Sequence, residues 1–177
     1  EFKAFENRGL PATPLHSVSK KCCHHGTTAE IMKISISSDF GWVLAALFST
    51  FVTNMFLTFQ VVAARNAFGV KYPALYAPPG HKHENKFNCV QRAHQNYLEN
   101  WPQVMVLTVV NGLFYPKYAA GFCAIFAFGR IIYGYGYKAF GPSGRQIGGA
   151  IAHVGDLPLL LMTPYIAYKL LSRDAIA

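Results

Sequence analysis

The sequence predicts an all-α integral membrane protein in which four helices form a bundle. Apolar residues make up 52% of its 177 residues and charged residues only 14%, against about 25% charged in an average soluble protein. Four long segments also contain almost no charged residues. Each is close to the roughly 20 residues that a helix needs to cross the hydrocarbon core. Only helices are expected there, because lipid offers the backbone no hydrogen-bond partners outside the segment.

The four-helix domain is predicted to span residues 39–177, after a polar N-terminal extension at residues 1–38. The extension is rich in Pro, Ser and Thr and lacks the apolar core of a secretory signal peptide. Its run Cys22-Cys23-His24-His25 contains metal-ligand residue types, but adjacent ligands are not typical of a zinc site. An inert or palmitoylated segment is the favoured interpretation, so no metal site is predicted there.

The first helix is expected at residues 40–64, followed by Arg65. Its amide side chains, Asn54 and Gln60, are expected to make helix–helix contacts. A loop at residues 69–86 comes next, because its three prolines are incompatible with a helix. Within this loop His81, His83 and Glu84 could form a metal site, but a solvated loop is the stronger interpretation.

The second helix is expected at residues 88–114, with a kink at Pro102. A short turn at residues 115–117 makes it an antiparallel neighbour of the third helix, residues 118–138. After a Gly-rich turn, the fourth helix is expected at residues 146–171, interrupted by Pro158 and Pro164.

The net charge of +8 does not indicate nucleic-acid binding, because the basic residues form no run with interleaved aromatics. Anionic lipid headgroups and cytoplasmic loops explain it more simply. Lys and Arg are concentrated after the first and third helices, which predicts that these two loops face the cytoplasm and both termini the opposite side.

A polar stripe runs into the second apolar segment. Arg92, Asn96 and Glu99 lie at i, i+4 and i+7, within about 40° of one helix face. Arg130, Tyr133 and Tyr137 form a similar stripe on the third helix, and Arg145 follows on the same side of the membrane. Such groups are costly in a bilayer and are expected to serve a ligand or a partner.

One interpretation of these stripes is an inter-helix salt-bridge network of Arg92, Glu99 and Arg130 without a ligand. It leaves a surplus of guanidinium groups, which match the geometry of carboxylates and invite an anionic ligand. Glutathione offers two carboxylates, an ammonium group, amides and a thiol that a nearby cation would ionise. A phospholipid headgroup would satisfy the same arginines.

Four runs then carry a family resemblance: FNCVQRAHQNYLENWP, GLFYPKYAA, GRIIYGYGY and GPSGRQIGG. In this order they resemble the family of membrane-associated proteins in eicosanoid and glutathione metabolism (MAPEG), over residues 42–149. The resemblance implies a homotrimer with glutathione as co-substrate, bound between protomers on the cytosolic side. It implies Arg145 as the catalytic residue that stabilises the thiolate. The implied glutathione contacts are Arg65, Arg92, Asn96, Glu99, Tyr133 and Tyr137.

The implied reactions are conjugation of glutathione to lipophilic electrophiles and reduction of lipid hydroperoxides, with the co-substrate entering from membrane lipid. Asn66 departs from relatives that conjugate leukotriene epoxide, which tend to have a second basic residue there. His94 points away from the Arg92 stripe and is expected to pack. Asp156 has no match in the family and could pair with an arginine or with another subunit.

Two alternatives stay open at this point. The chain could be a non-catalytic accessory or structural subunit of a larger membrane complex, or a scaffold that delivers lipid to an enzyme. The expected location is the endoplasmic reticulum membrane, with a mitochondrial or other organelle membrane as the alternative.

Overall fold

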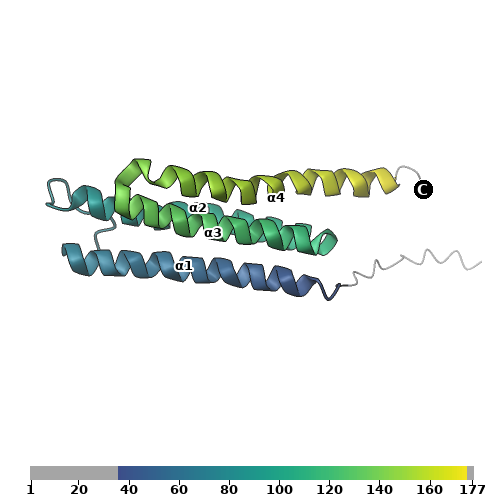
Figure 1. Cartoon of the computed structure of the whole chain (residues 1–177), viewed down its shortest axis with the longest axis horizontal. Helices are drawn as coiled ribbons and strands as arrows, with labels where there is room; N and C mark the ends of the chain where they lie inside the picture. Colours follow the sequence, from purple (N-terminus) through teal and green to yellow (C-terminus); the bar gives the residue numbers. More distant parts are fainter. Residues whose placement is uncertain (1–35, 175–177) are drawn as a thin grey trace, which may run out of the picture. The chain divides into compact units, whose positions relative to one another are not determined.

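The computed structural model of the chain describes residues 36–174, which form four α-helices and one short 3₁₀ turn (Figure 1). In order they are α1 (Phe40–Phe68), α2 (Glu84–Phe114), α3 (Pro116–Phe140), η1 (Gly141–Ser143) and α4 (Arg145–Asp174). These residues contain no strand, so the predicted all-α bundle is confirmed. Of the predicted extension, only residues 36–38 are among those described; the Cys22–His25 run lies outside them.

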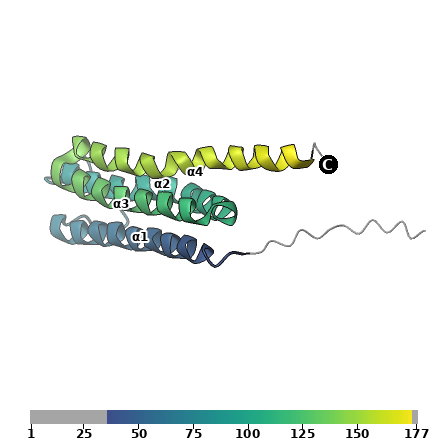
Figure 2. The same cartoon turned by 45° about the vertical axis from the view of Figure 1, so that its right-hand side comes forward.

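Within residues 36–174 the helices run lengthwise beside one another (Figures 1 and 2). α3 packs against each of the other three, whereas the described parts of α1 and α4 do not touch. The connection at residues 69–83 and η1 lie at the same end of the bundle, which we call the loop end. The turn at Tyr115 joins α2 to α3 at the opposite end, which makes these two helices antiparallel neighbours as predicted.

Two helix boundaries at the loop end differ from the prediction by four residues. α1 continues beyond residue 64 to Phe68 and ends where Gly69 adopts a left-handed conformation with φ of 70°, its N–H bonding to the Arg65 carbonyl. Glycine adopts this conformation without steric cost, which is why it ends helices so often. α2 begins at Glu84, before the expected residue 88. The Glu84 carboxylate accepts a hydrogen bond from the Gly80 N–H at 2.9 Å and sits favourably at a helix N-terminus.

The predicted interruption of the fourth helix is wrong: α4 is continuous through Pro158 and Pro164. A membrane helix tolerates proline where side chains satisfy the freed backbone groups. The carbonyls that Pro158 and Pro164 free are those of Val154 and Leu160. Between the two prolines, the Asn111 side chain on α2 anchors α4 by donating to the Leu159 carbonyl at 2.8 Å. The Thr163 hydroxyl donates to the same carbonyl at 3.2 Å.

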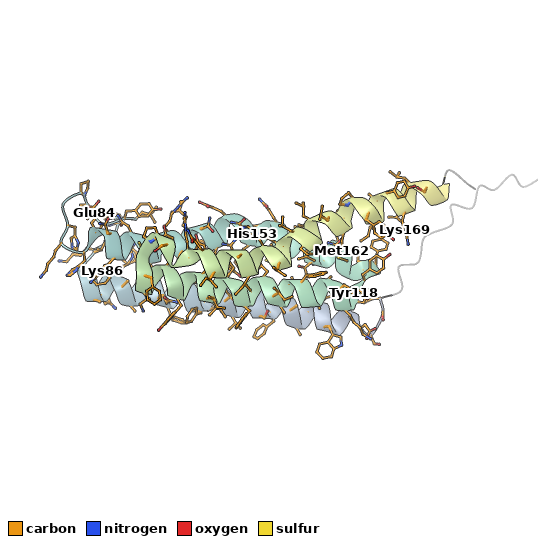
Figure 3. All side chains as sticks on the ribbon, turned by 45° about the horizontal axis from the view of Figure 1, so that its top comes forward. Glu84, Lys86, Tyr118, His153, Met162 and Lys169 are labelled. Carbon is orange, nitrogen blue, oxygen red and sulfur yellow. The ribbon has the colours of Figure 1, made fainter. Side chains whose placement is uncertain are left out.

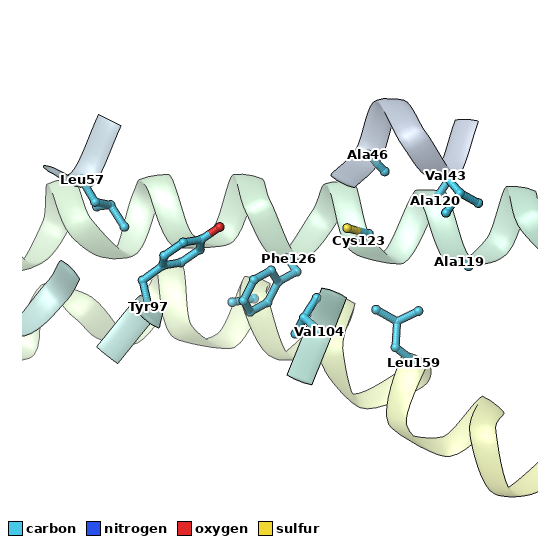
Figure 4. Packing of buried hydrophobic residues seen from close by; sticks show 11 residues of the cluster. Val43, Ala46, Leu57, Tyr97, Val104, Ala119, Ala120, Cys123, Phe126 and Leu159 are labelled. Atoms are coloured by element: carbon cyan, nitrogen blue, oxygen red, sulfur yellow. The ribbon is translucent and has the colours of Figure 1, made fainter. Parts of the chain in front are cut away.

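The main core takes residues from all four helices (Figure 4). Tyr97 is fully buried, stacks on Phe126 and Trp101, and donates a hydrogen bond to the Thr50 carbonyl at 2.6 Å. The Trp101 indole donates to the Thr50 hydroxyl at 2.9 Å. The hydroxyl of Tyr97 and the indole of Trp101 therefore both have partners, as burial requires.

α3 and α4 approach each other closely because glycines face the neighbouring backbone. A Cβ on Gly148 would lie 2.1 Å from the Tyr133 nitrogen, and one on Gly129 would lie 2.4 Å from the Ala152 nitrogen. Small residues at such points let membrane helices pack backbone to backbone. The contact at Gly148 fixes the part of α3 that carries Tyr133.

Three of the described helices, α1, α3 and α4, are long and apolar enough to cross a membrane. α2 is long enough at 31 residues, but charged and amide side chains occupy its first half. Many large apolar side chains of the bundle are exposed, among them Phe48, Phe59 and Leu161. An exposed apolar surface of this extent is typical of a protein embedded in lipid.

Candidate functional site

Four polar side chains on α2 and α3 form a connected group, which we call the polar cluster: Arg92, Asn96, Glu99 and Arg130. Arg92 pairs with Glu99 at 3.4 Å, and the Asn96 amide donates to the other Glu99 oxygen at 3.4 Å. Arg130 donates to the side-chain oxygen (Oδ1) of Asn96 at 2.7 Å. Asn96 therefore connects the arginine of α3 with the carboxylate of α2.

The two arginines of the polar cluster differ in burial. Arg130 is only 3% exposed, whereas the side chains of Arg92 and Glu99 are each 45% exposed. An exposed ion pair of this kind contributes little to stability, so a ligand can displace it at small cost. The salt-bridge network considered from the sequence joined Arg130 to Glu99. In the structure Arg130 instead bonds to Asn96, and only Arg92 pairs with Glu99.

Two buried tyrosines on α3 extend the polar cluster toward the start of α4. Tyr133 and Tyr137 pack edge to face, with ring centroids 5.7 Å apart. The Arg130 guanidinium lies 5.4 Å from the Tyr133 ring, and that of Arg145 lies 5.4 Å from the Tyr137 ring. Arg145 is exposed and forms no ion pair with a carboxylate of the described residues. An unneutralised guanidinium therefore stands beside the tyrosine pair.

Arg92 and Tyr137 line one hollow of about 390 Å³ at the loop end. Its other lining residues are Tyr76, Asn85, Asn88 and Cys89. The Tyr76 hydroxyl donates to the Gln95 side chain, and Asn88 accepts a hydrogen bond from the Ala77 N–H at 2.9 Å. These contacts hold the loop against α2. No sequence pattern pointed to Tyr76, because its position depends on how this loop folds.

Arg65 stands apart from the other predicted contacts in this chain. It is 7% exposed, and its terminal nitrogens donate to the carbonyls of Ala74 at 2.8 Å and Leu75 at 3.3 Å. Its guanidinium also lies over the Tyr72 and Phe87 rings, at 4.4 and 5.1 Å. The geometry gives Arg65 a role in closing the loop. The structure thus brings together six of the seven predicted site residues: Arg92, Asn96, Glu99, Tyr133, Tyr137 and Arg145.

His94 packs as its position on α2 predicts. Its Nε2 lies 3.2 Å from the Thr58 hydroxyl and 3.1 Å from the Asn54 side chain, both on α1. Asn54 thereby makes the helix–helix contact expected of it, whereas the buried Gln60 amide nitrogen has no partner in the described residues.

The residues considered for a metal site do not gather into one. The His83 N–H donates to His81 Nδ1 at 3.2 Å, and the His83 ring stacks on Phe68. Within the described residues no three His, Cys, Asp or Glu side chains are placed to share a metal ion.

A larger hollow, of about 650 Å³, lies at the opposite end of the bundle between the beginnings of α1 and α3. Small and apolar residues line most of it, and its charged groups are Asp39 and Lys117, which pair with each other at 3.2 Å. It therefore offers no uncompensated charge. The smaller hollow is lined by Arg92 and by Tyr137, whose ring lies 5.4 Å from the Arg145 guanidinium, and it has the chemistry for an anionic ligand.

The fold and this group of residues define a class: an integral membrane bundle of helices with cationic and tyrosine side chains gathered at one end. The family model of the MAPEG family matches residues 43–165, and the chain belongs to this family. Among curated proteins, the leukotriene C4 synthases of Bos taurus and Mus musculus are 32% and 35% identical over 83 residues. Each match covers 46% of this chain and 51% of the relative. The chain therefore spans about half the length of the curated relatives it matches.

Proposed function

We propose that the protein is a membrane-bound glutathione transferase or peroxidase. Glutathione would bind at the loop end, with its carboxylates on Arg92 and its ammonium group on Glu99. Asn96, Tyr133 and Tyr137 would supply hydrogen bonds. The membership in the MAPEG family and the relatives named leukotriene C4 synthases support an enzymatic role.

The observation that carries the proposal is the exposed Arg145 guanidinium beside Tyr137, which itself lines the hollow with Arg92. A cation held there without a carboxylate partner favours the thiolate of a bound thiol over the neutral form. The thiolate is the nucleophile, so this cation would activate glutathione for attack.

Two reactions follow from a glutathione thiolate. Attack on an electrophilic carbon forms a C–S bond, and the displaced or ring-opened group takes a proton. Attack on the terminal oxygen of a lipid hydroperoxide releases the alcohol, after protonation, and leaves glutathione as its sulfenic acid. A second glutathione then gives the disulfide and water. Asn66, which follows Arg65, argues for an electrophile other than leukotriene epoxide.

We further propose that the enzyme is a homotrimer in the endoplasmic reticulum membrane. The hollow beside Arg92 is open on this single chain, and a neighbouring protomer could complete it. The donors of Arg65 are committed to the loop of its own chain, so a contact with glutathione in a neighbouring protomer would compete with these bonds.

The test is the ultraviolet absorbance of the glutathione thiolate on titrating glutathione into the detergent-purified protein at neutral pH. A saturable signal that is lost in Arg145→Ala supports the proposal. Lys138→Ala is the matched control, because Lys138 is an exposed cation at the same end of the bundle and should leave the signal intact. No thiolate signal from the unmodified protein would contradict the enzymatic proposal and favour the accessory-subunit alternative.

A further inference from the structure

Polar side chains also gather away from the polar cluster, in a groove between α2 and α4. The groove has a volume of about 150 Å³, and we call it the α2–α4 groove. Its polar lining is Asn100, Gln103, His153 and Asp156, and its apolar lining is Val104, Leu107, Leu157 and Leu160. It thus combines four hydrogen-bonding side chains with an aliphatic wall.

His153 and Asp156 form a pair within this groove. The His153 Nδ1 lies 3.1 Å from both carboxylate oxygens of Asp156. The Asp156 side chain is 16% exposed and that of His153 is 59% exposed. Figure 3 shows His153 on α4 between Glu84 and Lys86 at one end of the bundle and Lys169 and Tyr118 at the other. The pair therefore lies well inside an apolar, membrane-spanning helix.

A carboxylate and an imidazole at this depth are costly unless something polar meets them. The side-chain amide of Asn100 donates one hydrogen bond to the backbone carbonyl of Asn96 at 2.8 Å. The Gln103 amide and the second ring nitrogen of His153 have no hydrogen-bond partner within residues 36–174, although both side chains reach the groove. The groove thus keeps hydrogen-bonding capacity that its own residues do not use.

The α2–α4 groove lies deeper along the same helix faces that carry Arg92 and Arg145 at the loop end. On α2, Gln103 lies eleven residues after Arg92 and within about 20° of the same face. On α4, Asp156 lies eleven residues after Arg145, again within about 20° of its face and about 16 Å deeper along the helix. Both helices therefore lead from the loop end, where the cations are, into the groove.

We propose that the α2–α4 groove binds a lipid co-substrate whose acyl chain carries a hydroxyl or similar oxygen group near its middle, which His153 and Asp156 recognise. This proposal rests on the proposed function and names its substrate class. The polar head of the lipid lies at the loop end, the chain follows the apolar wall, and the mid-chain oxygen meets the pair. The groove itself supplies recognition and no reacting atom.

The selectivity follows from the cost of unmet polar groups. A purely hydrocarbon chain would cover His153, Gln103 and Asn100 and leave their hydrogen-bonding atoms unpaired. A site built around such groups discriminates strongly against the ligand that lacks the partner oxygen. An oxygenated chain is therefore expected to bind better than its unsubstituted analogue.

Ricinoleic acid and oleic acid provide the matched probes, since they share a carboxylate and a double bond and differ by one mid-chain hydroxyl. Their binding to the full-length protein in nanodiscs is measured without glutathione. We expect ricinoleic acid to bind about ten-fold more tightly. The double variant His153→Leu/Asp156→Leu removes the pair together, so that no charge is left buried alone, and it should abolish the preference while still binding oleic acid.

Val154→Leu is the matched control, because Val154 is exposed on the same helix and does not line the groove. It should keep the preference. Equal affinity for the two acids in the unmodified protein, or a preference that survives the double variant, would overturn the proposal. Cross-linking of a cysteine placed at Leu157, which lines the groove, to another protein chain in native membranes, together with equal affinities, would identify a neighbouring helix as the occupant.

The outcome is separable from that of the proposed function, because thiolate formation is read on the unmodified protein in parallel. A thiolate signal without a ricinoleic preference overturns the groove proposal alone. A preference without a thiolate signal supports lipid recognition by the groove and contradicts the glutathione chemistry.

Discussion

The guanidinium of Arg130 on α3 donates a hydrogen bond to the side-chain oxygen of Asn96 on α2, at 2.7 Å. Arg130 is almost fully buried, and its Nε has no partner in the described residues. Asn96 is therefore the principal polar partner of a cation inside the bundle. Because the Asn96 amide also reaches Glu99, this one side chain links the buried cation to the exposed pair beside the hollow.

Replacing Asn96 by alanine is expected to lower stability, because it leaves the buried Arg130 without its hydrogen-bond acceptor. The loss should be about 1–3 kcal/mol, measured as a lower thermal unfolding temperature in detergent. Asn66→Ala is the control, since Asn66 is exposed on α1. Equal unfolding temperatures for the two variants would show that Arg130 has another partner in the assembled protein.

Replacing Arg92 by alanine should separate a ligand role from a structural one. The Arg92–Glu99 pair is half exposed at 3.4 Å, so its loss should leave the free energy of unfolding nearly unchanged. Glutathione affinity, measured by calorimetry, should fall about ten-fold or more because a charged hydrogen bond to a carboxylate is removed.

Lys86→Ala provides the comparison for Arg92→Ala, since Lys86 is an exposed cation earlier on the same helix. It should alter neither stability nor affinity. A large loss of stability in Arg92→Ala with unchanged glutathione affinity would instead support a ligand-free network.

The fold could be predicted from the sequence because a long segment without charged residues that crosses a bilayer must form a helix. The prediction was wrong at two helix boundaries and along α4, where the outcome depends on local contacts that the hydrophobic pattern does not reveal. The continuity of α4 through Pro158 and Pro164 was missed, because proline usually breaks a helix interior whereas a membrane helix tolerates it. The helix-ending conformation of Gly69 could in principle be read from the sequence, since glycine is the usual residue at that position.

The site was predictable only where helical spacing fixes it. The i, i+4, i+7 pattern placed Arg92, Asn96 and Glu99 on one face, and the structure joins them by hydrogen bonds. The partner of Arg130 was not predictable, because it depends on how α2 and α3 pack. The pairing of Asp156 with His153 follows the i, i+3 spacing of one helix and could have been found by that rule.

Replacing Arg65 by alanine should loosen the connection between α1 and α2. Three carbonyls of residues 70–75 accept hydrogen bonds from its guanidinium, and bonds to charged groups contribute about 1.5–3 kcal/mol each. We expect a loss of at least about 2 kcal/mol in stability and faster tryptic cleavage at Lys71. Arg65→Lys should rescue little, because an ammonium group cannot replace the planar fork.

Lys82→Ala serves as the control for Arg65→Ala, since Lys82 is an exposed cation in the same connection. Its thermal unfolding should match that of the unmodified protein. Unchanged stability of Arg65→Ala, with weaker glutathione binding, would assign Arg65 to the glutathione site of a neighbouring protomer rather than to its own loop.

Replacing Gly148 by alanine is expected to disturb both packing and the site. The added Cβ would lie 2.1 Å from the Tyr133 backbone nitrogen, so α3 and α4 must separate at this point. Overpacking of this kind typically costs about 1–3 kcal/mol, and Tyr133 should move with its backbone. Both a lower unfolding temperature and a weaker glutathione affinity are therefore expected.

Gly121→Ala is the matched comparison for Gly148→Ala, because it makes the same change within α3 where no atom lies within 4 Å of the added Cβ. There alanine should be neutral or stabilising by up to about 1 kcal/mol, since it favours a helix more than glycine does. If both variants behave alike, the α3–α4 contact is looser than the structure indicates. If Gly148→Ala loses stability but keeps its glutathione affinity, Tyr133 is a packing residue and the glutathione site is confined to α2, Tyr137 and Arg145.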